Sequence, residues 1–197
     1  MKTKFIIAAA ISILTAILFT GCDALKQVGG AYNFTKCKYD YKSITNPSLG
    51  GINFSGGISS ADGRRLAALL TDPSERLPLG FTINFEVTNP TANDAFMQGL
   101  SYVLNIDGVE FTRGRLNNRL EVKAGQKNTL PLDIGIDIME LLAGNAKDAA
   151  TGMVRNLAGI GDRKSEVSVM LKPSFMVSGR TVESPVEIPV SFSFGGK

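Results

Sequence analysis

Residues 81–90 read Phe-Thr-Ile-Asn-Phe-Glu-Val-Thr-Asn-Pro, and this stretch decides the fold that the sequence predicts. Apolar and polar residues alternate over its first eight positions, the pattern of a strand with one buried face and one solvated face. Pro90 has no N–H to give to a hydrogen-bond ladder, and Asn89 can form a local side-chain turn. We therefore predict a half-buried strand over residues 81–88 that leaves its sheet at Asn89.

The same alternation recurs along the chain. Residues 100–106 carry apolar side chains at every second position, and Asp107-Gly108 supplies the positive-φ pair of a hairpin turn onto a strand at 109–112. Further strands are predicted at 118–123, 127–132, 165–177 and 181–194.

The segment 181–194 contains two prolines within its alternating pattern. Pro185 and Pro189 cannot donate to a ladder, so this strand should lie at a sheet edge or begin late. The side chains expected to face inward are Val186, Ile188, Val190, Phe192 and Phe194.

Two segments have helical instead of alternating spacing. Residues 60–71 begin with a serine cap and space three leucines at helical intervals, which predicts a short helix. Residues 137–157 place apolar side chains three, four and seven positions apart. This predicts a longer helix packed on a sheet, although Gly144 and Gly152 each cost about 1 kcal/mol relative to alanine.

No internal repeat and no long Pro/Gly/Ser linker divides the chain into two domains. The predicted fold class is mainly β: an antiparallel immunoglobulin-like or fibronectin-III-like β-sandwich with one longer covering helix and one short helix. The core between its sheets should contain Phe85, Val87, Leu104, Ile106, Ile188 and Val190.

The N-terminus has the layout of a bacterial lipoprotein signal. Lys2 and Lys4 precede an apolar run over residues 5–19, and Gly21-Cys22 resembles the site at which a cysteine receives a diacylglyceryl group. An uncleaved transmembrane anchor is the alternative, because the run approaches the roughly 20 residues that a spanning helix needs. Either interpretation puts the body of the chain outside the cytoplasm. The expected parts are a signal peptide at 1–21, a tether at 22–31 that starts with the lipidated Cys22, and a single domain at 32–197.

Composition and charge exclude several function classes. The chain has 21 Lys and Arg against 18 Asp and Glu, and loss of Lys2 and Lys4 with the signal would leave 19 against 18. A nearly neutral body does not suit the neutralisation of nucleic-acid phosphates. The chain has no histidine, so Ser-His-Asp and Cys-His nucleophile pairs and histidine zinc sites are impossible. We expect no enzyme activity, no cofactor, no metal and no nucleic-acid partner.

Two groups of polar residues have structural interpretations that compete with functional ones. Cys37 shares an alternating face with Tyr39 and Tyr41, which favours a buried thiol over a reactive one. Asp133, Asp137 and Glu140 lack the spacing of a calcium loop, so we expect them to stabilise a helix N-terminus.

The glycine and arginine clusters also have structural interpretations that we prefer to functional ones. Gly159-Ile160-Gly161 follows the predicted longer helix and is interpreted as its stop signal. The arginines at 64 and 65, and those at 113, 115 and 119, are interpreted as parts of solvated faces.

Three segments carry a resemblance to a known family. They are the strand that ends in Asn89-Pro90 with the hairpin after it, the Leu130-Pro131-Leu132 stretch before the longer helix, and the closing strand 186–192. This pattern resembles the type 2 late embryogenesis abundant family, also called the water-stress and hypersensitive-response domain. The resemblance implies a small fibronectin-like or immunoglobulin-like sandwich without known catalytic residues, linked to stress protection and to interaction at membranes. It carries no binding residue over to this chain.

The sequence favours a non-enzymatic lipoprotein of the bacterial cell envelope, lipid-anchored and facing the periplasm. The domain would act as a stress-protective or protein-interaction module, with the membrane as one partner through Cys22 and an envelope protein as another. The alternative is a periplasmic carrier of a lipid or small apolar ligand, in which the sandwich and the longer helix would frame a pocket.

Overall fold

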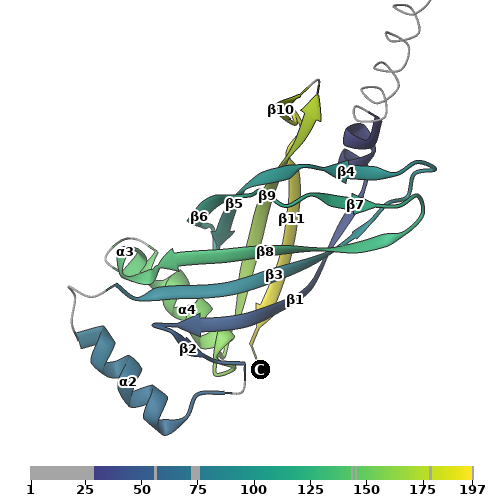
Figure 1. Cartoon of the computed structure of the whole chain (residues 1–197). Helices are drawn as coiled ribbons and strands as arrows, with labels where there is room; N and C mark the ends of the chain where they lie inside the picture. Colours follow the sequence, from purple (N-terminus) through teal and green to yellow (C-terminus); the bar gives the residue numbers. More distant parts are fainter. Residues whose placement is uncertain are drawn as a thin grey trace, which may run out of the picture.

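The computed structural model describes residues 29–55, 57–71, 76–142, 144, 146–177 and 179–196. The predictions for residues 1–28, including the signal peptide and the lipidated Cys22, lie outside the described residues. Within them the chain is mainly β, with antiparallel sheets and few helices, as the sequence predicts (Figure 1).

The first sheet is built around the strand that ends in Asn89. Its order is β2-β1-β3-β8, and every pairing in it is antiparallel. The central strand β3 pairs with β8 without a register shift, from Pro78 opposite Asp137 to Thr88 opposite Lys127. The bounds are β1 Lys38–Leu49, β2 Ile52–Asn53, β3 Pro78–Thr88 and β8 Lys127–Asp137.

The second sheet has the order β10-β9-β5-β6, and β11 pairs with the earlier part of β9. Asp107 and Gly108 have φ values of 49° and 81°, so the predicted hairpin turn joins β5 to β6. A separate pair, β4 with β7, extends beyond the start of β5. The bounds are β4 Ala95–Met97, β5 Gly99–Ile106, β6 Val109–Leu116, β7 Leu120–Val122, β9 Lys164–Val177, β10 Arg180–Glu183 and β11 Ile188–Gly195.

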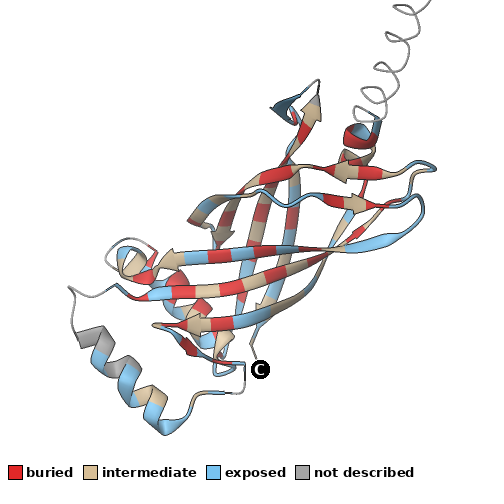
Figure 2. Cartoon of the chain, viewed as in Figure 1, coloured by how far each residue is buried: buried red, intermediate tan, exposed pale blue. Residues whose placement is uncertain are grey.

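The inward faces of both larger sheets contribute to one hydrophobic cluster (Figure 2). The Tyr102 hydroxyl of β5 donates a hydrogen bond to the Asp133 carbonyl of β8 at 3.4 Å. The Phe85 and Phe192 rings meet edge to face with centroids 6.1 Å apart. Of the predicted core residues, Ile188 is only half-buried. The others are buried, as predicted: Phe85, Val87, Leu104, Ile106 and Val190.

The segment 181–194 is not one continuous strand. β10 ends at Glu183 and β11 begins at Ile188, with Pro185 between them, so the predicted late start is correct. The inward orientation predicted for Val186 is wrong, because this side chain is 52% exposed in the break.

The predicted helix over 137–157 is also wrong as a single element. Asp137 belongs to β8, where it pairs with Pro78, and α3 (Ile138–Leu142) is separate from α4 (Lys147–Leu157). Gly144, which is unfavourable inside a helix, lies in the interruption. α4 packs against β9, β5 and β11, which is the covering position predicted for the longer helix.

Helix α2 (Ser60–Thr71) forms where a helix is predicted. The capping serine is Ser59 and not the predicted Ser60: the Ser59 hydroxyl accepts the N–H of Asp62 at 3.1 Å and donates to the Asp62 carboxylate at 2.5 Å. In Figure 1, α2 stands apart from the two larger sheets.

Candidate functional site

The N-terminal helix at residues 29–35 is part of the packed domain. Ala31 and Phe34 are buried, and the Asn33 side-chain amide donates to the Asp94 carbonyl at 3.2 Å. A Cβ built on Gly30 would lie 2.1 Å from a carbon of the Phe96 ring, so helix and β4 are in close contact. The described chain therefore begins at a fixed place on the domain surface.

Cys37 lies directly behind this helix, in the core, as predicted. Its Sγ faces the Asn33 carbonyl at 3.5 Å, and burial raises the pKa of the Cys37 thiol from 9.0 to about 11. The Tyr39 hydroxyl donates to the Phe34 carbonyl at 2.7 Å, and burial also raises the pKa of Tyr39. The thiol is held in its neutral, unreactive form.

Cys22 is seven residues upstream of Gly29. A chain of that length spans at most about 25 Å when fully extended. A group attached to Cys22 would stay within that distance of the helix at residues 29–35. In the described part of the chain, no helix is long and apolar enough to cross a membrane.

Exposed ion pairs surround the β4–β7 pair beside this helix. Lys123 bridges Asp94, at 2.8 Å, and Glu121. The hydrogen bond from Lys123 lowers the pKa of the Asp94 carboxyl, and the Ala124 N–H adds to this. Arg119 lies 5.5 Å from the Phe96 ring centroid and 3.6 Å from Glu121. This supports the interpretation of Arg119 as part of a solvated face.

Asn89 holds the loop that follows β3 through side-chain hydrogen bonds. Asn89 is fully buried, and its Oδ1 accepts the N–H of Thr91 at 3.0 Å, which is the local side-chain turn predicted from the sequence. Its Nδ2 donates to the carbonyls of Asn93, at 2.8 Å, and Val122, at 2.9 Å. Asn89 thus joins the end of β3 to β7.

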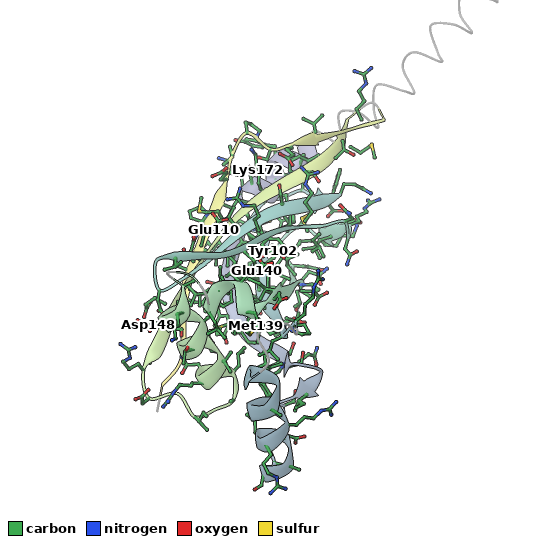
Figure 3. All side chains as sticks on the ribbon, turned by 90° about the vertical axis from the view of Figure 1, so that its left-hand side faces the viewer. Tyr102, Glu110, Met139, Glu140, Asp148 and Lys172 are labelled. Atoms are coloured by element: carbon green, nitrogen blue, oxygen red, sulfur yellow. The ribbon has the colours of Figure 1, made fainter. Side chains whose placement is uncertain are left out.

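A shallow depression of about 480 Å³ lies on the outer face of the second sheet. Strand pairing places Arg113, Val103 and Met170 in one row across the sheet, and Arg115, Ser101 and Lys172 in the next. The floor is partly apolar and the rim is charged. Figure 3 labels Glu110 on β6 and Lys172 on β9, two strands of this sheet.

The cations of this depression already have acidic partners. Arg113 holds both oxygens of Glu110 at 2.6 and 2.7 Å, while Arg115 and Lys172 lie 3.0 and 3.8 Å from Glu183. These side chains are between 38% and 72% exposed, so the pairs contribute little stability. The arrangement agrees with the predicted solvated face and does not single out an anionic ligand.

A second depression, of about 640 Å³, lies between α4 and the first residues of β9. Its charged lining is balanced between three aspartates and three cations: Asp107, Asp148, Asp162, Arg155, Arg163 and Lys164. One Asp107 oxygen already accepts the Glu166 N–H at 2.9 Å. Among the residues that the structure describes, no group of three His, Cys, Asp or Glu side chains is placed to hold a metal ion.

The structure separates Asp133 from the other two carboxylates, because Asp137 directly precedes α3 and Glu140 lies in its first turn. Asp137 accepts the N–H groups of Leu77, at 3.1 Å, and Met139, at 3.2 Å, so it caps the start of α3 as expected. Asp133 instead lies in β8 and accepts the Thr82 hydroxyl at 2.7 Å, so the expected role at a helix N-terminus is wrong for it.

The end of α4 contains a contact that sequence reasoning missed. Gly159 has a φ of 71° and stops the helix, as predicted. The buried Asn156 donates to the Ser165 hydroxyl at 2.9 Å and accepts the Gly196 N–H at 3.2 Å. It joins α4 to β9 and to the C-terminus. The sequence does show an asparagine at an apolar position of the predicted helix, which indicates a buried polar contact. It does not identify the partners, because Ser165 and Gly196 lie outside that helix.

No family model matches the sequence, and no curated protein matches it. Among solved structures, the chain is similar to a protein from Archaeoglobus fulgidus at 14% sequence identity and a TM-score of 0.39, over 80% of this chain and 98% of that chain. It is similar to an Arabidopsis thaliana protein at 14% identity and a TM-score of 0.42, over 80% of this chain and 77% of that one. It is also similar to a candidate late embryogenesis abundant (LEA) protein at 11% identity and a TM-score of 0.38, over 96% and 87% of the two chains. These similarities concern the fold and say nothing of function.

Proposed function

We propose that this chain is a non-enzymatic lipoprotein of the bacterial cell envelope, anchored through Cys22 and facing the periplasm. The observation that carries the proposal is the Gly21-Cys22 pair after a charged start and an apolar run. The short spacing to Gly29 supports it, because the packed helix at residues 29–35 begins soon after the proposed lipid.

We infer that the domain is a sandwich of the type 2 LEA kind and serves as a stress-protective or protein-interaction module. The Asn89-Pro90 pattern supports this inference, since Asn89 ends β3 through the side-chain turn that the resemblance contains. The common hydrophobic cluster of both larger sheets also supports a sandwich.

A carrier of lipid or a small apolar ligand has less support. Such a carrier needs a cavity within its core. Ile83, Phe85, Leu104 and Val169 have no solvent-accessible area, and a side chain that borders a void of water size would have some. These central residues therefore line no such void.

The test is a comparison of two cysteine substitutions in cells labelled with a fatty-acid analogue. Cys22→Ser should abolish the label and leave a precursor that is larger by residues 1–21. The matched control Cys37→Ser should keep the label and the normal mobility, because Cys37 is buried. Undiminished label in Cys22→Ser would refute the lipoprotein proposal.

A further inference from the structure

Two strongly exposed apolar side chains, Tyr32 and Val182, lie at the same end of the molecule. Tyr32 is 61% exposed on the N-terminal helix, and Val182 is 49% exposed on β10. β10 pairs with the last residues of β9, with Val182 opposite Phe175. Figure 1 shows β10 and the N-terminal helix at this end.

One side-chain contact and one backbone hydrogen bond give this placement independently of the view. The N-terminal helix packs on the Phe96 ring of β4. Gln98, directly after β4, donates its N–H to the Ser174 carbonyl at 2.7 Å, and Glu183 of β10 pairs with the same Ser174. β4 and β10 therefore flank the end of β9, and the described chain begins beside them at Gly29.

A cation accompanies each of the two apolar side chains. The Lys36 ammonium lies 5.1 Å from the centroid of the Tyr32 ring. Arg180 and Val182 are two positions apart on β10 and share a face of that strand. Arg180 has no salt bridge among the described residues, whereas the nearby Glu183 is engaged by Arg115 and Lys172. Tyrosine and arginine beside apolar groups suit the headgroup region of an anionic membrane.

We propose that this anchor-side surface, defined by Tyr32, Lys36, Arg180 and Val182, lies against the headgroups of an anionic phospholipid bilayer. The proposal rests on the proposed function, because the described chain begins at Gly29 beside this surface and a lipid on Cys22, seven residues earlier in the sequence, would hold it near the membrane. The contact would orient the domain, with β9 running away from the bilayer toward Lys164. The depression beside α4 would then face away from the membrane.

The chain has no tryptophan, so a single introduced tryptophan reports on one position. The reporters are Val182→Trp and the conservative Tyr32→Trp. The matched control is Ile160→Trp, because Ile160 is 59% exposed but lies just before the opposite end of β9. Phe175 and Ser165, which mark the two ends, are separated by about 33 Å of strand at roughly 3.3 Å per residue.

Each full-chain variant is purified from membranes of expressing cells and mixed into vesicles of phosphatidylethanolamine and phosphatidylglycerol, with or without brominated acyl chains. Because interfacial side chains reach roughly 5–10 Å into the headgroup and acyl boundary, emission from Val182→Trp and Tyr32→Trp should fall by about half with brominated lipid. Emission from Ile160→Trp should not change.

Flotation of the vesicles separates the possible failures. Protein that floats with the vesicles but is quenched at neither end, or equally at both ends, overturns the bilayer contact and leaves the lipid anchor standing. Absence of quenching at both ends is also the result expected if the natural partner of this surface is an envelope protein and not the bilayer. Protein that does not float overturns both proposals.

Discussion

The Tyr102 ring lies over Gly114, the residue opposite it on β6, in the space that a side chain at this position would need. A Cβ built on Gly114 would be 2.5 Å from the Tyr102 hydroxyl oxygen and 2.7 Å from the ring carbon that bears it. The missing side chain lets Tyr102 cross the edge strand β6 and reach the Asp133 carbonyl of β8. This contact links the edges of the two larger sheets.

Gly114→Ala should therefore destabilise the domain. The Tyr102 ring is buried and cannot move without breaking its contact with β8, so we expect a loss of about 1–3 kcal/mol in the free energy of unfolding, measured by chemical denaturation. The control is Gly135→Ala, because Gly135 also lies within a strand but has no atom near its Cβ position. That variant should be neutral or slightly stabilised.

A double substitution tests the cause of this loss. If the clash with the ring is responsible, Gly114→Ala should cost much less when Tyr102 is already alanine. Equal costs in the two backgrounds would show that Tyr102 is not the reason for the glycine.

Truncation of Phe85 tests the predicted register of β3. Phe85 has no exposed area and contacts Phe192, so Phe85→Ala should cost about 3–5 kcal/mol in the free energy of unfolding. Ser191→Ala, at an exposed position of β11, should change it by less than about 0.5 kcal/mol. A large loss at Ser191 with a small one at Phe85 would contradict the register.

Asn89→Ala should remove both donors that hold the loop after β3. The carbonyls of Asn93 and Val122 would lose hydrogen bonds in a buried or partly buried place, so we expect a loss of about 2–4 kcal/mol in thermal or chemical unfolding. Asn93→Ala is the control, since only the backbone of Asn93 takes part in this network. The hypothesis fails if the two variants are equally stable.

The alternating strands could be predicted because each strand buries one face. Apolar and polar residues then alternate along its own sequence, and this pattern is visible without knowledge of the neighbouring strands. β3 and β5 follow this rule, and the hairpin at Asp107-Gly108 depends only on adjacent residues. The end of β8 could not be predicted in this way. Asp137 continues a helical spacing, but its pairing with the distant Pro78 keeps it in the sheet.

The surface clusters could be predicted only in part. The arginines at 113 and 115 are recognisable as an exposed group, but Lys172 and Glu183 join them through the order of β6, β5, β9 and β10. The shared end of the N-terminal helix and β10 depends on the same strand order. Local spacing contains no information about that order, so the anchor-side surface required the structure.

The last prediction concerns alkaline pH. Burial raises the pKa of the Cys37 thiol from 9.0 to about 11, and burial also raises the pKa of Tyr39. Below about pH 9 the thiol is protonated in both the folded and the unfolded chain, so its contribution to stability is complete. Between about pH 9 and 11 the unfolded chain loses the proton first, and the free energy of unfolding should fall as pH rises.

Cys37→Ala separates the thiol from the tyrosine. Its free energy of unfolding, measured between pH 8 and 11 by circular dichroism, should fall less steeply than that of the unchanged protein, because only Tyr39 and the other groups still ionise. In the unchanged protein Cys37 should also react slowly with a thiol reagent at pH 8, since the neutral thiol is a poor nucleophile. Identical pH profiles for the two proteins, or rapid reaction of Cys37 in the folded state, would contradict its burial as a protonated thiol behind the N-terminal helix.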